Sequence, residues 1–229
     1  MDAPRRATDC CTRLSMENFA NDAPELRDEA FQETAAQLGI SKAIIEKDFW
    51  VCWSLKQLFA LPTFGGQMIF KGGTSLSKAY DVIHRFSEDV DLSLDREQLG
   101  FVGDRDPEDP DLSGKKQKRL LQELEEAAKE AVGGQLLAEI QTVFGSGLVQ
   151  SFTLSVDPSD PQTILFAYPT LEESNAGYVK QVEVRPEMPY VWRRKYSSMP
   201  LRWVAAPSAV FLCPFARASD CEKPFTWAS

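Results

Sequence analysis

Histidine is almost missing from this sequence, because His84 is the only one among 229 residues. The five cysteines are odd in number and lack the paired spacing of metal ligands. A zinc site and a histidine-based catalytic triad are therefore both disfavoured. His84 itself is expected at the end of a helix rather than as a catalytic base. The cysteines fit the reduced thiols of cytosolic proteins.

Long apolar runs are missing as well. No stretch of 18 apolar residues occurs, which argues against a helix that spans a membrane. The first 20 residues lack the apolar segment of a secretory signal. These two absences predict a cytoplasmic protein that has no membrane partner.

Positive charge is the third shortage. The chain has 25 Lys and Arg against 34 Asp and Glu, and its formal net charge is −9. This balance argues against broad electrostatic capture of nucleic acid, although a local basic surface is compatible with it. Apolar residues make up 43% of the chain and charged residues 26%, as in an ordinary globular protein. The length suffices for one core, with or without a helical annex.

The most informative stretch covers residues 67–95 and reads QMIFKGGTSLSKAYDVIHRFSEDVDLSLD. Residues 67–71 form a short apolar run, which predicts a strand, and Gly72-Gly73 break it. The period then becomes helical, and the apolar positions of the predicted helix are Leu76, Ala79, Tyr80 and Ile83. From Asp89 the period changes to two, which predicts a second strand.

One face of this second strand is acidic. Its alternating residues are Asp89, Asp91, Ser93 and Asp95 on one side and Val90, Leu92 and Leu94 on the other. Carboxylates at i and i+2 point the same way, with Cα atoms about 6.6 Å apart, and repel each other unless a cation lies between them. Hard oxygen ligands suit Mg²⁺, which also binds substrate phosphates. Asp89 and Asp91 are therefore predicted to bind Mg²⁺.

The turn before the helix supplies the complementary half of such a site. Gly72, Gly73 and Thr74 bring backbone amides that can approach a triphosphate closely, and the following helix N-terminus favours anions. These three residues are predicted to bind the nucleotide phosphates. Further candidates for phosphate contact are Lys71, Arg85 and Lys78, the last of which is equally well explained as an exposed lysine.

The segments KGGTSLSKAY and RFSEDVDLSL resemble the first motif of the AbiEii/AbiGii toxin family of nucleotidyltransferases, which belongs to the polymerase-beta-like superfamily. The motif consists of Gly-Gly or Gly-Ser, a helix and Asp-x-Asp. EKDFWVCWSLKQLF (46–59) resembles the family's preceding helix, and ILFAYP (164–169) and GYVKQVE (177–183) resemble its later strands. The resemblance covers roughly residues 25–183.

The resemblance implies an α+β fold, a small mixed sheet with flanking helices. It also implies Mg²⁺-dependent transfer of a nucleotidyl group from an NTP to an acceptor hydroxyl. In polymerase-beta-like enzymes a third carboxylate from a later strand joins the Asp-x-Asp pair. Glu183 is the best placed candidate here, although a polar strand face would also explain it.

The same resemblance implies a biological role. The family consists of toxins of toxin–antitoxin or phage-defence systems, so a cognate antitoxin encoded nearby is the expected partner. In some members the acceptor is the 3′ end of tRNA, which makes RNA a candidate partner. The choice of NTP is open, and a protein or a metabolite could accept the nucleotide by the same metal chemistry.

The N-terminal part of the chain is predicted to be helical after an irregular start. Residues 1–24 are polar and proline-bearing and are expected to lack regular structure. Residues 25–39 predict a helix that ends at Gly39. Its expected buried residues are Leu26, Ala30, Phe31, Ala35 and Leu38.

A second helix is predicted to begin after Ser41 as its N-cap and to end before Pro62. Its wide apolar stripe indicates that it packs on the sheet. Lys47 and Asp48 on this helix have two interpretations, a support for the active site or a solvated face.

Residues 100–114 predict a solvated loop rich in Gly, Pro and Asp rather than a metal site. Residues 115–144 predict a helix with a break at Gly133-Gly134. The first turns of this helix carry the basic residues Lys115, Lys116, Lys118 and Arg119. These residues either face phosphate or are simply exposed lysine and arginine. Residues 148–157 and 163–168 predict a hairpin, and residues 178–184 predict a last strand.

The chain departs from the family pattern after Glu183. Residues 184–229 have little helical period and scattered Trp, Cys and Pro. One reverse translation of residues 184–189, read without its first base, spells Phe-Gly-Pro-Arg-Cys, as the family would continue. We hypothesise that residues 184–229 are an atypical, frame-shifted tail, and that the C-terminal helical part is lost or replaced. The loss of this part favours an alternative to the enzyme, a non-catalytic remnant that binds nucleotide or antitoxin, whereas the intact first motif argues against that alternative. A purely structural protein is a third interpretation.

Overall fold

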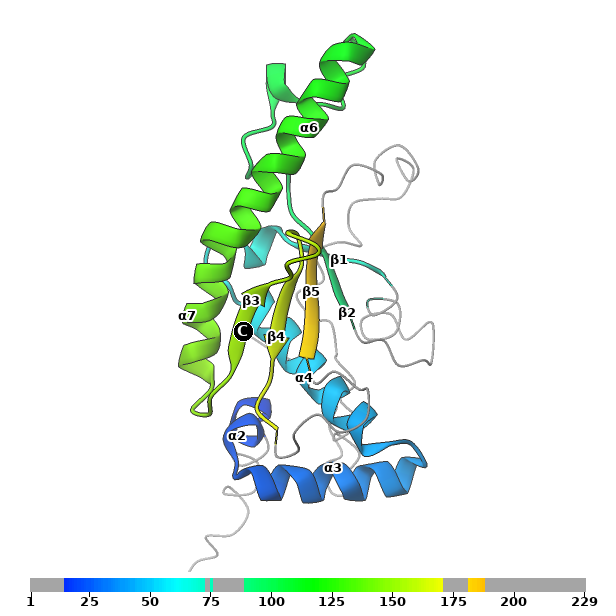
Figure 1. The fold of residues 1–229 in the computed structure, drawn as a ribbon, viewed down its shortest axis with the longest axis vertical. Coiled ribbons are helices and arrows are strands. Elements are labelled where there is room, and N and C mark those ends of the chain that lie inside the picture. The colour runs from blue at the N-terminus through cyan, green and yellow to red at the C-terminus, as the bar shows by residue number, and fades with distance from the viewer. Residues whose placement is uncertain (1–14, 73–74, 76–88, 171–180, 188–229) are drawn as a thin grey trace, which may run out of the picture.

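The structure is built on a mixed sheet of five strands, as the α+β prediction requires (Figure 1). The computed structural model describes residues 15–72, 75, 89–170 and 181–187. The strands are β1 (Ile69–Phe70), β2 (Asp89–Ser93), β3 (Thr153–Val156), β4 (Ile164–Ala167) and β5 (Gln181–Glu187). Across the sheet their order is β1, β2, β5, β4, β3, with β2 and β5 parallel and the other neighbours antiparallel.

The helix α4 (Lys42–Phe59) covers one face of this sheet (Figure 1). Trp50 and Trp53 are completely buried on it and lie 6.0 and 5.8 Å from the ring of Phe166 in β4. The buried residues that the central strands contribute to this core are Val90, Leu92, Val182 and Val184. Because side chains alternate along a strand, the residues between these belong to the opposite face.

Both ends of α4 agree with the prediction. The charged residues Lys47 and Asp48, however, do not lie on a solvated face. The hydroxyl of Ser41 accepts a hydrogen bond from the backbone N–H of Ile44, so Ser41 is the N-cap. Lys47 and Asp48 are only 5% and 6% exposed. The interpretation of these two residues as a solvated face is therefore wrong.

The helices α2 (Met16–Asn21) and α3 (Pro24–Leu38) precede α4. The expectation of irregular structure is wrong for α2, because the hydroxyl of Ser15 accepts from the N–H of Asn18 and caps a short helix there. The predicted end of α3 is confirmed, since Gly39 adopts the left-handed conformation with φ of 69°.

The buried side of α3 differs from the prediction. Leu26 and Leu38 are 56% and 55% exposed, whereas Arg27 is 2% exposed. The guanidinium of Arg27 donates to the backbone carbonyls of Ala20, Asp22 and Pro169. These hydrogen bonds satisfy the buried guanidinium of Arg27. The buried face of α3 therefore differs from the face that hydrophobicity alone predicts.

A long helical segment runs from α6 (Gly114–Ala131) through a π-helical turn (Val132–Leu136) to α7 (Leu137–Gly147). The predicted break at Gly133-Gly134 is confirmed as this π turn. α7 packs on the core, where the ring of Phe144 lies 4.8 Å from that of Trp53. α6 extends beyond the sheet (Figure 1). No helix in the described part of the chain is long and apolar enough to cross a membrane.

The last strand extends further than the sequence predicted. β3 and β4 form the expected hairpin, although β3 begins only at Thr153. β5 continues through Val184 to Glu187, so the boundary that we expected after Glu183 falls inside a strand. Pro186, which has no backbone N–H, lies beyond the end of the β4 pairing, and its partner in the described part of the sheet is Leu92 of β2.

Candidate active site

The parallel pairing of β2 with β5 brings three predicted carboxylates to one face of the sheet. In this register Asp89 lies beside Glu183, and Asp91 lies beside Arg185. Val90 and Val184, which alternate with them, are buried on the α4 side. The acidic residues therefore stand on the face opposite α4, with Asp89 at the start of β2 and Asp91 and Glu183 inside their strands.

Arg185 links two of these carboxylates, and the sequence analysis did not identify it. Its Nη1 lies 2.9 Å from Oδ2 of Asp89, and its Nη2 lies 2.5 Å from Oε2 of Glu183. Partial burial lowers the pKa of Arg185, but the hydrogen bond to Glu183 and the charges of Asp89, Glu183 and Asp91 outweigh it and raise the pKa above its usual value. The residue was missed because it lies beyond the expected domain boundary, although strand alternation from Glu183 would have placed it on this face.

The turn after β1 reaches the same carboxylates. The backbone N–H of Lys71 donates to the carbonyl of Asp91 at 2.9 Å. Gly72 has φ of 74°, and a Cβ atom placed on it would lie 1.9 Å from Oδ2 of Asp91. The hydroxyl of Ser75 donates to the carbonyl of Gly72 at 2.8 Å. Glycine is therefore required at position 72, both by its backbone conformation and by the closeness of the Asp91 carboxylate.

The acidic face of β2 is shorter than predicted. Ser93 is only 2% exposed, and its hydroxyl has no hydrogen-bond partner in the described part of the protein. Asp95 lies after the end of β2 and accepts from the N–H of Glu97 in a turn. The expected row of four polar residues is thus reduced to Asp89 and Asp91, because the chain turns away after Ser93.

Several other candidates lie outside the described residues. They are Gly73, Thr74, Lys78, His84 and Arg85. Of the predicted phosphate-binding group, the structure therefore places only Lys71 and Gly72, and both adjoin Asp91.

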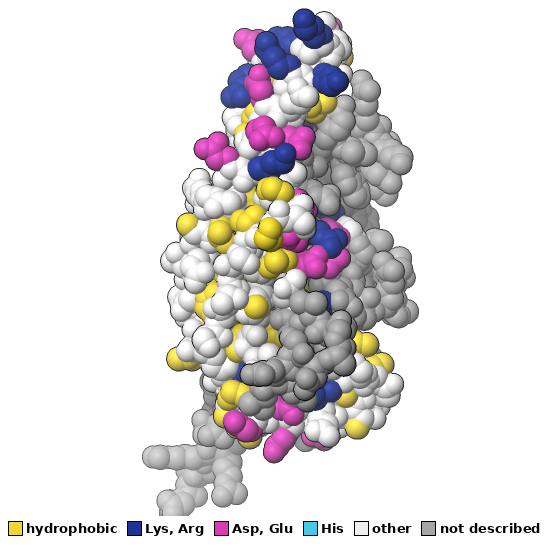
Figure 2. Space-filling view, in the orientation of Figure 1, with side chains coloured by type: hydrophobic (Ala, Val, Ile, Leu, Met, Phe, Trp, Pro, Cys, Tyr) yellow, Lys and Arg dark blue, Asp and Glu magenta, His cyan; other side chains and the backbone are white. Residues whose placement is uncertain are grey.

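Charged side chains gather midway along this face, in the region that β5 occupies (Figure 2). Asp89, Glu183 and Arg185 are each about one third exposed. Partial exposure leaves these groups accessible to a ligand, while the strands on both sides fix their backbones. The arrangement combines three negative charges with one positive charge on adjacent strands.

The donor set fits Mg²⁺ by its chemistry, since carboxylate oxygens are the ligands that this ion prefers. The glycine at position 72 keeps the space beside Asp91 free of a side chain. Within the described residues, however, no three His, Cys, Asp or Glu residues stand together as a ready metal site. Two of the three carboxylates are instead engaged by Arg185.

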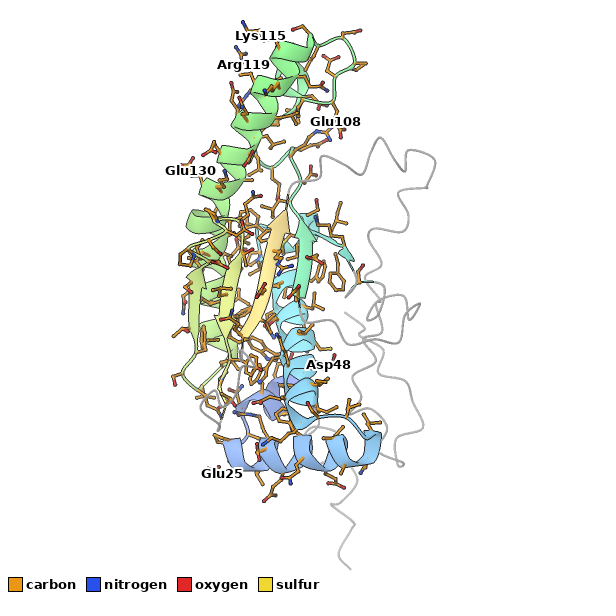
Figure 3. The ribbon with its side chains drawn as sticks, turned by 45° about the vertical axis from the view of Figure 1, so that its right-hand side comes forward. Glu25, Asp48, Glu108, Lys115, Arg119 and Glu130 are labelled. Carbon is orange, nitrogen blue, oxygen red and sulfur yellow. The ribbon has the colours of Figure 1, made fainter. Side chains whose placement is uncertain are left out.

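Two other charged regions lie away from this face. In the loop before α6, Arg96 lies 3.0 Å from both Asp106 and Glu108, so part of the acidic run forms ion pairs. Lys115 and Arg119 lie toward the far end of α6 (Figure 3). The basic residues at the start of this helix are exposed, and their exposure agrees with the simpler of the two interpretations.

Comparison with known families gives one match. The family model described as nucleotidyl transferase AbiEii toxin, type IV TA system, matches residues 53–194. The matched span includes β1, β2 and β5, and with them Asp89, Asp91, Glu183 and Arg185. Neither the curated proteins nor the solved structures give a match.

Proposed function

The chain belongs to the AbiEii nucleotidyl transferase toxin family of type IV toxin–antitoxin systems, and from this premise we propose that it transfers a nucleotidyl group from an NTP to an acceptor hydroxyl. The proposal assigns Asp89, Asp91 and Glu183 as the carboxylates that bind Mg²⁺. The observation that carries it is the register of β2 and β5, in which Asp89 and Glu183 are direct neighbours. Strands far apart in the sequence thus contribute carboxylates to one face.

The reaction that we propose is an in-line displacement at the α-phosphorus. A bond forms between the acceptor oxygen and the α-phosphorus, and the bond from that phosphorus to the bridging oxygen of the β-phosphate breaks. Pyrophosphate leaves with that bond's electron pair, and the acceptor hydroxyl loses its proton. Mg²⁺, if held by Asp89, Asp91 and Glu183, would stabilise negative charge on the phosphates and lower the pKa of the attacking hydroxyl.

The residues of this chain divide the remaining tasks. Asp89 and Asp91 would hold the metal, and Glu183 would complete the set and accept the proton of the acceptor hydroxyl. The backbone of the turn at Gly72 binds the β- and γ-phosphates, together with Gly73 and Thr74 of the predicted motif. Gly72 supports this assignment because its missing side chain lets the Asp91 carboxylate lie directly against the backbone of the turn.

Membership of a toxin–antitoxin family implies an antitoxin as partner. We propose that this antitoxin is encoded beside the toxin and that the acceptor is RNA, with the 3′ end of tRNA as the first candidate. The exposed basic residues Lys115 and Arg119 on α6 offer a local surface for RNA on an otherwise acidic protein.

A second candidate function is a remnant that binds nucleotide or antitoxin without turnover. The observation that favours it is the engagement of Asp89 and Glu183 by Arg185, which occupies oxygens that the metal would need. Nucleotide binding without transfer is the property that separates this remnant from an enzyme.

The test incubates the full chain with labelled NTPs, Mg²⁺ and total RNA. Transfer of label to RNA supports the enzyme, whereas stabilisation by nucleotide without transfer supports the remnant. The control is Asp91→Asn, which should abolish transfer and Mg²⁺-dependent nucleotide binding and leave the fold intact. The apo variant should be slightly more stable than the wild type, because one of two repelling carboxylates is removed. Calorimetry that gives the variant the same Mg-NTP affinity as the wild type would refute the assignment.

A further inference from the structure

Arg185 sits where the proposed metal would have to bind. The register places it beside Asp91, yet its guanidinium turns toward the other pair and forms ion pairs with Asp89 at 2.9 Å and Glu183 at 2.5 Å. Two nitrogens of one planar group thus engage two carboxylates from different strands. Hydrogen bonds between a guanidinium and a carboxylate are charge-assisted, which makes them stronger than neutral hydrogen bonds.

The guanidinium offsets part of the negative charge of the site. Asp89, Asp91 and Glu183 bring three negative charges, and Arg185 is the one positive residue that the structure places among them on β2 and β5. All three carboxylates favour the charged form of Arg185, as its raised pKa shows. Without a cation at this position, neighbouring carboxylates would repel each other across the two strands.

The guanidinium and a metal ion compete for the same carboxylate oxygens. Oδ2 of Asp89 and Oε2 of Glu183 are the atoms that Arg185 holds. A metal bound by these carboxylates would also be repelled by the guanidinium, which carries the same sign of charge. Metal binding therefore requires Arg185 to move away.

A nucleotide offers the displaced guanidinium a new partner. Phosphate oxygens match the fork of an arginine as well as a carboxylate does. The side chain of Arg185 is 37% exposed, so it is not locked in by packing. It can exchange carboxylate for phosphate without disturbing the core.

We propose that Arg185 is a built-in counter-ion that closes the metal site until the phosphates of an NTP draw it away. Metal and nucleotide then bind cooperatively, because the nucleotide removes the cation that competes with the metal. By linkage, the metal strengthens nucleotide binding by the same factor. The inference rests on the proposed function, since it concerns the same carboxylates and the same nucleotide.

The test measures Mn²⁺ binding to the full chain by electron paramagnetic resonance, with Mn²⁺ as the probe in place of Mg²⁺. Each variant is titrated alone and with a mixture of α,β-methylene analogues of the four ribonucleoside triphosphates. Arg185→Gln should bind Mn²⁺ about tenfold more tightly than the wild type when no nucleotide is present. The gain in Mn²⁺ affinity that nucleotide gives should be smaller in this variant, and the apo variant should melt at a lower temperature.

Two further variants serve as controls, one for the change in net charge and one for the loss of the guanidinium. Arg119→Gln removes the same charge from an arginine that pairs with Glu123 at 3.3 Å on α6 (Figure 3), and it should bind Mn²⁺ as the wild type does. Arg185→Lys keeps the charge but loses the fork, and its Mn²⁺ affinity without nucleotide should lie between those of the wild type and Arg185→Gln. Because it preserves the ion pair in part, it also serves if Arg185→Gln fails to fold.

The outcomes separate this inference from the proposed function. If Arg185→Gln and Arg185→Lys bind Mn²⁺ with wild-type affinity while Asp91→Asn loses Mn²⁺-nucleotide binding, the counter-ion role is refuted and the metal site stands. An equal tightening in Arg119→Gln would likewise refute it, because the effect would then be one of net charge. If neither the wild type nor the Arg185 variants bind Mn²⁺, with or without nucleotide, both proposals fall.

Discussion

At the scale of single residues, the site depends on the absence of a side chain at Gly72. Gly72 faces the carboxylate of Asp91 so closely that a Cβ atom would lie 2.8 Å from Cγ and 1.9 Å from Oδ2. The backbone there is also left-handed, with φ of 74°. Position 72 thus combines two requirements that only glycine meets, and both concern a proposed metal ligand.

We expect Gly72→Ala to displace the Asp91 carboxylate and to strain the turn. The free energy of unfolding should fall by about 1–3 kcal/mol, and Mn²⁺ affinity should fall with it. Chemical denaturation and Mn²⁺ titration measure the two effects. The matched control is Gly66→Ala, where nothing lies within 4 Å of the new Cβ. Equal results for both variants would show that the contact with Asp91 is unimportant.

The residues of the site were predictable to different degrees. Asp89 and Asp91 follow from alternation within one strand, which is a local property of the sequence. That Glu183 lies beside Asp89 depends on the pairing of two strands far apart in the chain, and only the resemblance to a family suggested it. Arg185 has an ordinary position in the sequence, and its role depends on where its side chain turns after the strands have paired.

At the scale of elements, α6 differs from the other long helices in what it packs against. Its buried residues are Leu120, Leu124 and Ala128, and none of them belongs to the main core cluster. α4 and α7, in contrast, contribute Trp50, Trp53 and Phe144 to that cluster. α6 is therefore held by a smaller apolar contact of its own.

We predict that the amides of α6 exchange hydrogen faster than those of α4 and α7. Local opening costs less where fewer buried apolar groups are exposed by it. Hydrogen exchange followed by mass spectrometry of the full chain compares peptides from the three helices in one experiment, so each serves as control for the others. Protection of α6 equal to that of α4 would mean that the two helices open only in global unfolding.

The elements were predicted better than their ends. Helical periodicity located the segment from residue 114 to 147, and two adjacent glycines marked its break, but the π turn depends on hydrogen bonds that packing selects. β5 was predicted to end near residue 184, where the resemblance to the family stops, but it continues through Pro186 to Glu187. The proline is accommodated because β4 no longer pairs with the chain at that point.

At the scale of the whole molecule, polar contacts tie the N-terminal helices to segments that adjoin the sheet. Arg27 donates to Pro169, which follows β4, as well as to Ala20 and Asp22. The side chain of Asn21 donates to the carbonyl of Gly147 and accepts from the N–H of Val149. Segments about 130 residues apart in the chain are joined in this way.

We expect Arg27→Leu to lower the free energy of unfolding of the whole domain by about 2–4 kcal/mol, because buried carbonyls lose their donor. Burial lowers the pKa of Arg27, and the charges of Glu46, Asp22 and Glu25 oppose this effect. Urea unfolding followed by tryptophan fluorescence reports the change, since Trp50 and Trp53 are fully buried.

The control for this variant is Arg119→Leu, which changes an arginine that is 66% exposed. It should alter the free energy of unfolding by less than about 0.5 kcal/mol. If each variant unfolds in a single transition, the helices and the sheet unfold together. If the two substitutions had equal effects, the buried contacts of Arg27 would not be what joins the N-terminal helices to the sheet.

The parallel pairing of β2 with β5 also has a consequence for protein synthesis. β2 leaves the ribosome long before β5, and until then its only strand neighbour is the two-residue β1. A nascent chain that stops short of Glu183 has Asp89 and Asp91 but neither the third carboxylate nor the strand that aligns them. A growing chain therefore lacks the complete proposed site until β5 has emerged and paired with β2. If this chain transfers nucleotides as proposed, that activity can arise only after this late pairing.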